Sequence, residues 1–244
     1  MEKIYARPTG LLNTSNPYCP GCSHPTISKI IAEVLDEMGL RDNALIVYAI
    51  GCTTLSQVMF TFNMASALHG RAPSLATGYK RIRPDQPVIL IQGDGDAIAI
   101  GASETINTAS RGEPLTVIVV NNQIFGMTGG QMSPTTLTGQ ASTTSPNGRD
   151  PSVTGYPVRM AEMIAILDAP RYVTRCGVFA PKYTIKAKKA IQKGLEIQIN
   201  EKGYSYIELI SACPVNWHME PVDTMRYIEE SVLPVYPLGD LKTK

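Results

Sequence analysis

Residues 90–131 read LIQGDGDAIAIGASETINTASRGEPLTVIVVNNQIFGMTGGQ and contain two apolar runs that each end in polar groups. The first run ends at Gly93-Asp94-Gly95, and the second ends at Asn121-Asn122. A helix-length segment separates them, so the pattern predicts two parallel strands joined by a crossover helix. Such sheets bind ligands beyond the carboxyl ends of their strands, and both polar groups lie at such ends.

The same alternation of apolar runs and helix-length segments continues along the chain and predicts an α/β fold with a mostly parallel sheet flanked by helices on both faces. Strands are expected at Ala44–Ile50, Pro87–Gln92, Leu115–Asn121, Tyr172–Val178 and Ser205–Ser211. Helices are expected at Pro25–Met38, Ala72–Arg81, Ala97–Arg111, Pro157–Leu167 and Lys182–Glu201. Residues 122–155 are rich in Gly, Thr, Ser and Pro and are expected to form a long functional loop. No repeat or linker interrupts the chain, so residues 1–244 are expected to form a single domain.

Composition and charge argue against several classes of protein. The 244 residues are 43% hydrophobic and carry a formal net charge of +1, which gives no electrostatic reason to expect a nucleic-acid partner. The first nine residues lack the apolar segment of a secretion signal, and no run of about 18 apolar residues could span a membrane. We therefore expect a cytoplasmic protein without membrane or nucleic-acid partners.

Gly93-Asp94-Gly95 does not fit the dinucleotide-binding fingerprint. The third glycine of that pattern would fall at position 98, which is isoleucine. An aspartate in the turn would also repel a phosphate approaching a helix N-terminus, unless a divalent cation lies between them. Asp94 and the side-chain carbonyl of Asn122 are therefore candidate magnesium ligands. The alternative is that Asp94 caps a helix and that Asn121-Asn122 forms a polar turn.

The two motifs are separated by 25 residues (96–120), and this arrangement is the thiamine diphosphate and magnesium motif. Together with further short motifs, it resembles the β subunit of 2-oxoacid:ferredoxin oxidoreductases. These motifs are Tyr18-Cys-Pro-Gly-Cys22, Ile50-Gly-Cys52, Leu68-His-Gly-Arg-Ala72, Ala76-Thr-Gly78, Gly93-Asp-Gly-Asp96 and Gly126-Met-Thr-Gly-Gly-Gln131.

The resemblance implies a thiamine-diphosphate-binding fold and assigns residues to the cofactor. Magnesium is expected on Asp94, Asn122 and the carbonyl of Ile124. The diphosphate is expected around Ile50, Gly51, Cys52, Thr53, His69, Gly95, Asp96, Gly126 and Met127. His69 would donate a ring N–H to a diphosphate oxygen.

The five cysteines are expected to be ligands or reactive thiols rather than disulfides. Cys19 and Cys22 form a C-x-x-C hook whose spacing suits either zinc or an iron–sulfur cluster. The family resemblance implies a 4Fe–4S cluster on Cys19, Cys22, Cys52 and Cys213, while Cys176 is expected to be a buried core thiol. Because Cys52 also belongs to the diphosphate segment, the cluster would lie near the cofactor, as electron transfer requires.

The resemblance further implies one subunit of an enzyme that oxidatively decarboxylates a 2-oxoacid to acyl-CoA and CO2. Coenzyme A is then the co-substrate, and ferredoxin accepts the electrons. The glutamate that activates thiamine is expected on a partner α subunit, because Glu104 does not match its position. The chain also lacks the cysteine runs of ferredoxin-type clusters, so γ and ferredoxin-like δ subunits are expected as partners.

The substrate is predicted from the segment that follows Cys52. Residues 51–62 contain no charge, and their larger side chains could form an apolar wall at Leu55, Met59, Phe60 and Phe62. A dicarboxylic substrate such as 2-oxoglutarate needs a cation for its distal carboxylate. A branched-chain 2-oxoacid such as 2-oxoisovalerate is therefore favoured, unless Lys80, Arg81 or a partner subunit supplies that cation. Ordinary core packing is the alternative explanation of the four side chains.

Two other classes of function remain open. A non-oxidative thiamine diphosphate decarboxylase or carboligase would keep the magnesium site without needing four cysteines. A structural subunit with zinc would keep the cysteines without needing the magnesium site. The oxidoreductase accounts for both sets of residues. His24 could donate to a cluster sulfide or only begin a helix, and His218 receives no role.

Overall fold

The structure is a computed structural model that describes residues 6–243, and its centre is a seven-stranded sheet. The strand order is β2-β1-β3-β4-β8-β7-β9, and all neighbours are parallel except β7 and β9. The strands are β1 Leu45–Tyr48, β2 Asn63–Ser66, β3 Val88–Gly93, β4 Thr116–Asn121, β7 Tyr172–Gly177, β8 Ser205–Ile210 and β9 Gly239–Thr243. The predicted α/β class with a mostly parallel sheet is confirmed.

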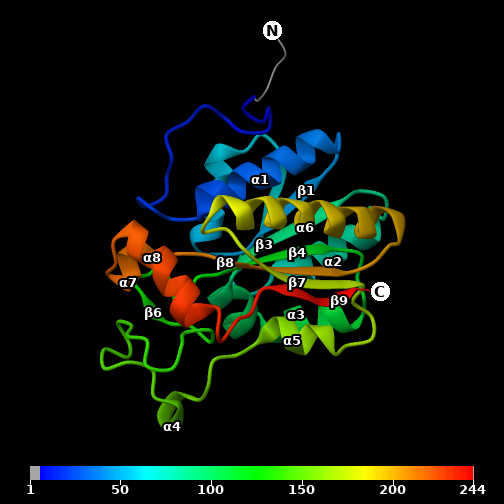
Figure 1. The fold of residues 1–244 in the computed structure, drawn as a ribbon. Helices are drawn as coiled ribbons and strands as arrows, with labels where there is room; N and C mark the ends of the chain where they lie inside the picture. Colours follow the sequence, from blue (N-terminus) through cyan, green and yellow to red (C-terminus); the bar gives the residue numbers. More distant parts are fainter. Residues whose placement is uncertain (1–5, 244) are drawn as a thin grey trace.

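Helices cover both faces of this sheet (Figure 1). One layer consists of α1 His24–Glu37 and α6 Pro181–Asn200, and the other of α2 Ala72–Ile82, α3 Ala102–Ser110 and α5 Met160–Ala165. Alternate side chains of β3 enter the two layers, since Ile89 and Ile91 pack towards α1 and α6 while Val88 and Leu90 pack on the opposite side. The central strands are therefore apolar on both faces, as a buried parallel sheet requires.

The helix predicted over Ala97–Arg111 is wrong as a single element. The chain forms a π-helical turn, η2 Gly95–Ile100, and α3 begins only after Gly101. The amide of Gly101 donates to the carbonyl of Asp96, five residues earlier, at 2.8 Å. A Cβ on Gly101 would lie 2.6 Å from the carbonyl oxygen of Gly70, so the interruption allows the two backbones to pack closely.

The helix predicted over Pro157–Leu167 begins later than expected, at Met160. The amide of Val158 donates instead to the carbonyl of Pro134 at 2.9 Å, which holds this segment against the preceding loop. The five predicted strands and the remaining three helices are present, with ends that differ from the expected ones by at most two residues.

The two edge strands of the sheet, β2 and β9, were not predicted. Both are short and partly exposed, so neither shows a clear alternation of buried and exposed side chains. The C-terminal helices were missed as well, and they are α7 Pro214–Trp217, α8 Pro221–Tyr227 and the π-helical turn η3 Ile228–Val232. With Ile124, Leu137 and Ile210 these helices build a third apolar cluster beyond the carboxyl ends of the strands.

The predicted long loop between β4 and α5 is well organised. It begins with a hairpin of β5 Ile124–Phe125 and β6 Gln131–Met132 and ends near a single helical turn, α4 Pro151–Thr154. Arg149 is 5% exposed, and its guanidinium donates to carbonyls on both sides of the loop, including those of Thr136 at 2.8 Å and Tyr156 at 2.9 Å. One buried side chain thus fixes the loop in place of regular secondary structure.

Among residues 6–243, none of the helices combines the length and apolar character needed to traverse a lipid bilayer.

Candidate functional site

A cavity of about 80 Å³ lies at the carboxyl ends of β1, β3 and β4. It is lined by all nine residues expected around the diphosphate and by the three expected at the magnesium. The structure therefore brings together three segments that are far apart in the sequence: residues 50–53, 93–96 and 122–128. This convergence follows from the parallel sheet, because the ends of neighbouring strands meet at one edge.

Asp94 lies at the floor of this cavity with an exposed fraction of 2%. One of its carboxylate oxygens accepts hydrogen bonds from Ser133 Oγ, at 2.7 Å, and from Thr135 Oγ1. Burial raises the pKa of Asp94 to about 6, and these hydroxyls oppose the rise. The groups that most strongly oppose this rise are side-chain hydroxyls and backbone amides, which carry no positive charge.

The two asparagines at the end of β4 have different surroundings. Asn122 lines the cavity, its Oδ1 accepts from the Ile124 amide at 3.2 Å, and its main-chain oxygen accepts from Trp217 Nε1 at 3.1 Å. Asn121 is fully buried, and its Nδ2 donates to Glu208 Oε1 at 2.7 Å. Only Asn122 is therefore available as a metal ligand, whereas Asn121 anchors the turn.

A buried charge network supports Asn121 from behind. Glu208 Oε2 accepts from Arg175 Nε at 2.6 Å, and both side chains are fully buried. The guanidinium of Arg175 also donates to both carboxylate oxygens of Glu162, at 2.9 Å for the Nη1–Oε1 pair. Burial disfavours the charge of Arg175, but the two carboxylates outweigh that effect and raise its pKa. The network links the turn to β8, β7 and α5.

Asp96 holds the neighbouring wall of the cavity through its side chain. Its carboxylate accepts from the Gly70 amide at 2.7 Å, from Gln92 Nε2 and from His69 Nδ1. The ring nitrogen Nδ1 of His69 is thereby occupied, which leaves Nε2 as the ring nitrogen for a ligand. The side chain of Asp96 thus orients His69. The main-chain groups of Asp96 are the part of this residue that could contact an anionic ligand.

Two observations show that the cavity fits a cofactor with anionic oxygens. The hydroxyl of Thr53, a cavity residue that is 2% exposed, has no hydrogen-bond partner. A Cβ on Gly95 would lie 2.3 Å from the ring of Phe125, so the chain passes this point without a side chain. A buried unpaired hydroxyl beside a glycine-rich wall suits a diphosphate, and the side-chain oxygens of Asp94 and Asn122 are of the type that Mg2+ prefers.

Four of the five cysteines influence one another electrostatically. Burial raises the pKa of the Cys22 thiol to about 12, and the charges of Cys213, Cys52 and Cys19 add to the rise. Burial likewise raises the pKa of Cys52 to about 11, with further contributions from Cys213, Cys19 and Asp94. Within residues 6–243, no three histidine, cysteine or acidic side chains gather closely enough to hold a single metal ion.

Cys176 has different neighbours from the other cysteines. It lies on β7, with its thiol 3.9 Å from Thr174 Oγ1, and its pKa is raised to about 11 by burial and by Asp240. Its side chain is partly buried and packs against the apolar layer of α1 and α6.

His24 lies beside the cysteine hook. It begins α1, its Nδ1 lies 3.2 Å from Cys22 Sγ, and its ring stacks on Tyr18. Burial lowers the pKa of His24 to about 4, so this ring is neutral at physiological pH.

The apolar wall predicted after Cys52 does not line the cavity. Phe60 and Phe62 are 3% and 4% exposed and belong to the core beneath α1, where their rings pack edge to face. Leu55 and Met59 lie on the 3₁₀-helical turn η1 Cys52–Met59, outside the cavity lining. The alternative explanation of core packing is therefore the right one for the two phenylalanines.

The two cations considered for a distal carboxylate are engaged elsewhere. Lys80 Nζ donates to the Gln86 carbonyl at 2.7 Å, and Arg81 pairs with Glu113. Neither of them lines the cavity, and no other lysine or arginine does so in the described part of the chain.

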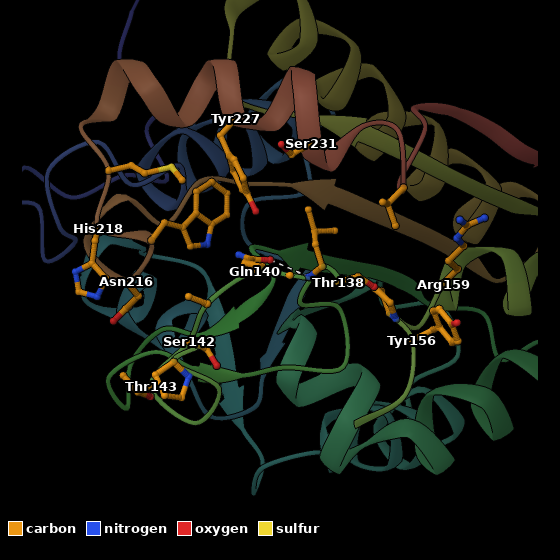
Figure 2. Close-up of a pocket in the computed structure, with 18 residues that line it drawn as sticks. Thr138, Gln140, Ser142, Thr143, Tyr156, Arg159, Asn216, His218, Tyr227 and Ser231 are labelled. Atoms are coloured by element: carbon orange, nitrogen blue, oxygen red, sulfur yellow. Dashed lines mark hydrogen bonds between the residues drawn. The ribbon is translucent and has the colours of Figure 1, made fainter. Parts of the chain in front are cut away.

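A second, larger cavity of about 1100 Å³ opens between the loop at Leu137–Pro146 and the C-terminal helices (Figure 2). Asn216 and His218 form one end of it, and Tyr156 and Arg159 form the other. His218 is exposed and adopts a left-handed conformation, with φ at 53°, at the end of α7. None of these four residues had been predicted as a site residue from a motif.

Comparison with known proteins identifies the family. Residues 49–209 match the family described as thiamine pyrophosphate enzyme, C-terminal TPP binding domain. The 2-oxoglutarate synthase subunit KorB of Methanocaldococcus jannaschii is 32% identical over 230 residues, which cover 92% of this chain and 81% of that protein. The chain belongs to the thiamine-diphosphate-binding subunits of the 2-oxoacid:ferredoxin oxidoreductases. The family predicted from the motifs is confirmed.

Other members of this oxidoreductase family extend beyond the chain. The ketoisovalerate oxidoreductase subunit VorA of Methanothermobacter thermautotrophicus is 39% identical over all 244 residues, and the chain spans about half of its length (51%). A solved 2-oxoglutarate:ferredoxin oxidoreductase from Magnetococcus marinus, with 2-oxoglutarate, coenzyme A and succinyl-CoA bound, has the same fold. It superposes with a TM-score of 0.81 at 23% identity, and the aligned region covers 99% of this chain and 86% of the solved chain.

The residues that hold Asp94 and Asn122 in place were mostly not predicted from the sequence. Ser133 and Thr135 bind Asp94, and Trp217 binds the Asn122 carbonyl, yet all three belong to segments without a motif. Their roles depend on the path of the loop and of the C-terminal helices. The spacing of residues in the sequence does not indicate that path.

Proposed function

We propose that this chain is the cofactor-bearing part of an enzyme that oxidatively decarboxylates a branched-chain 2-oxoacid to acyl-CoA and CO2. One observation carries the proposal: Asp94, Asn122 and Cys52 line the same cavity. The proposed magnesium–diphosphate site therefore adjoins Cys52, whose charge interacts with those of Cys19, Cys22 and Cys213. A non-oxidative decarboxylase needs only the first feature, and a structural zinc subunit needs only the second.

In this proposal Asp94, Asn122 and the carbonyl of Ile124 hold Mg2+, which binds the diphosphate. Ile50, Gly51, Cys52, Thr53, His69, Gly95, Asp96, Gly126 and Met127 surround that group. When bound, thiamine diphosphate supplies a nucleophilic carbon and an electron sink for decarboxylation. The chain contributes the free hydroxyl of Thr53, the ring N–H of His69 in the orientation set by Asp96, and a buried floor at Asp94.

Cys19, Cys22, Cys52 and Cys213 are proposed to hold a 4Fe–4S cluster next to the cofactor. Their mutual electrostatic influence supports this set, and the separate surroundings of Cys176 leave that thiol out. Deprotonating these neighbouring thiols is unfavourable because the thiolates would repel one another, and bound iron would offset that cost because it binds the deprotonated form. A cluster held by these four cysteines would supply a one-electron acceptor beside the cofactor site, on the way to ferredoxin.

The preference for a branched-chain substrate rests on charge and on similarity. Residues 6–243 place no lysine or arginine around the cavity, so the chain offers no partner for a second carboxylate. Identity to a ketoisovalerate oxidoreductase subunit, at 39%, is also higher than the 31% to 35% found for four 2-oxoglutarate synthase subunits. We therefore favour 2-oxoisovalerate over 2-oxoglutarate.

The remaining components belong to the whole enzyme. Coenzyme A is proposed as the acyl acceptor, and the activating glutamate is proposed on an α subunit, because no glutamate lines the cavity in the described residues. Further γ and ferredoxin-like δ subunits are proposed to carry electrons to ferredoxin. We also propose that residues 1–244 form a single domain and that the assembly works in the cytoplasm.

The test is to purify the chain anaerobically with its natural partner subunits and to assay viologen reduction with coenzyme A. We expect faster turnover with 2-oxoisovalerate than with 2-oxoglutarate, together with iron, sulfide and a visible absorption band that bleaches on reduction. Zinc in place of iron, or CO2 release without dye reduction in the parent enzyme, would contradict the proposal. A preference for 2-oxoglutarate would overturn only the substrate assignment.

A further inference from the structure

Asn216 is a side chain that contacts residues of both proposed sites. It lies on the one-turn helix α7, three residues after Cys213, and is half-buried. Its Nδ2 donates to the carbonyl of Gly126 at 3.0 Å and to Cys213 Sγ at 3.3 Å. Gly126 belongs to the diphosphate segment and Cys213 to the cysteine set, so one amide group is shared between them.

The space around Asn216 is closely filled on the diphosphate side. A Cβ on Gly130 would lie 3.0 Å from Asn216 Oδ1, and a Cβ on Gly126 would lie 3.6 Å from Nδ2. The same Cβ on Gly126 would lie 3.3 Å from Cys52 Sγ, which brings a second cysteine to this point. Asn216 therefore occupies the space between two thiols and the Gly126–Gly130 turn. Its other side forms part of the larger cavity, near His218 (Figure 2).

We infer that Asn216 is a positioning residue that couples the two sites, by holding the Gly126 carbonyl and by donating a hydrogen bond to the Cys213 sulfur. This inference rests on the proposed function, because it requires a cluster on Cys213 and a diphosphate beside Gly126. It adds a residue that no motif of the chain singles out.

The expected effects follow from the charges involved. Reduction adds an electron to the cluster, and an N–H donor to a ligand sulfur stabilises the more negative state, so it raises the reduction potential. The bond to Gly126 fixes one carbonyl of the turn, so that the neighbouring amides stay oriented towards the diphosphate. Removing the Asn216 amide should therefore lower the potential and weaken cofactor binding in the same variant.

The experiment uses the assembled enzyme with Asn216→Leu, which keeps a side chain of similar size and removes the donor. Redox titration followed by electron paramagnetic resonance should show the ratio of reduced to oxidised cluster falling about tenfold at a fixed potential, which is about 59 mV for one electron. Calorimetry with Mg2+ and thiamine diphosphate should show about fivefold weaker binding. Neither readout depends on turnover.

Further variants distinguish an effect on the reduction potential from a simple loss of structure. Asn216→Asp replaces the donor by a negative charge and should lower the potential more than leucine does, whereas Asn216→Gln keeps a donor and should recover part of it. Asn107→Leu removes an exposed amide on α3 whose Nδ2 donates to Ser103, away from both sites, and it should leave both measurements unchanged.

The outcomes distinguish this inference from the proposed function. A parent enzyme without cluster or bound thiamine diphosphate would refute the proposed function itself. If the parent holds both and the Leu and Asp variants keep its potential, or only one of the two measurements responds, the coupling role is wrong. Loss of the cluster in all three Asn216 variants would make the residue structural and would also overturn the inference.

Discussion

The indole N–H of Trp217 donates a hydrogen bond to the main-chain oxygen of Asn122 at 3.1 Å. This bond joins the C-terminal helix α7 to the turn that follows β4. Trp217 is the single tryptophan of the chain, is 8% exposed, and packs against Tyr227. A buried fluorophore is therefore in direct contact with the main chain of Asn122.

We predict that titration with Mg2+ and thiamine diphosphate changes the fluorescence of Trp217. Trp217→Phe should abolish the signal and weaken binding about fivefold, because a buried carbonyl loses its donor. Stopped-flow fluorescence and calorimetry would measure the two effects. An unchanged emission spectrum at saturating cofactor would show that Asn122 is not at the metal site.

Asp94→Ala and Asn122→Ala should each abolish retention of thiamine diphosphate and leave the iron content unchanged, because the two sites use separate ligands. The measurements are calorimetric titration and iron analysis on the same preparations. Asn107→Ala, on the exposed side of α3, serves as the matched control. Normal affinity in both site variants would refute the magnesium assignment.

Cys52→Ser should separate decarboxylation from oxidation. A serine hydroxyl is a poor iron ligand, so dye reduction should collapse while slow CO2 release from carboxyl-labelled 2-oxoacid continues. Cys176→Ser should impair neither, because Cys176 lies apart from the other four cysteines. Our ligand assignment fails if Cys176→Ser is the variant that loses the cluster.

The isolated chain should be inactive with every 2-oxoacid. No glutamate lines the cavity in the described residues, and apolar side chains are exposed around it, with Ile50 at 43%, Met127 at 47% and the neighbouring Leu68 at 79%. An exposed apolar rim of this kind fits a partner subunit. Viologen reduction by the purified chain alone, with coenzyme A present, would disprove the need for a partner.

Glu162→Gln should lower the free energy of unfolding at pH 7 by about 1 to 2 kcal/mol. Burial opposes the charge of Glu162, but the hydrogen bonds and charge of Arg175 outweigh it and hold the pKa of the carboxyl below its usual range. This stabilisation is complete above the unfolded pKa of glutamate, about 4.3, and disappears as pH falls through the lower folded value.

Chemical denaturation of parent and Glu162→Gln at several pH values would therefore show a difference that closes below about pH 4. Glu37→Gln provides the comparison, since Glu37 is 57% exposed and pairs with Lys188 on the surface. It should change stability by less than about 0.5 kcal/mol. A difference for Glu162→Gln that persists in acid would show that packing, and not charge, carries the effect.

The central sheet could be predicted because its strands are apolar on both faces and carry polar groups at their ends. The short edge strands β2 and β9 could not, since they bury too little to leave a pattern. The split at Gly101 depends on close approach of Gly70, a contact across 31 residues that periodicity does not record. Asp94 could be placed at a strand end from its local motif, whereas Ser133 and Thr135 reach it through the path of the loop, which no local pattern records.

The hydroxyls of Ser133, Thr135 and Thr136 have a consequence for protein engineering. The first two bind Asp94, and the third donates to the carbonyl of Gln123, whose left-handed backbone, with φ at 58°, shapes the turn after β4. The loop and the strand ends therefore form one transplantable unit. A chimaera that exchanges the loop between relatives would have to carry these three hydroxyls, while grafts between Gly139 and Gly148 would leave them untouched.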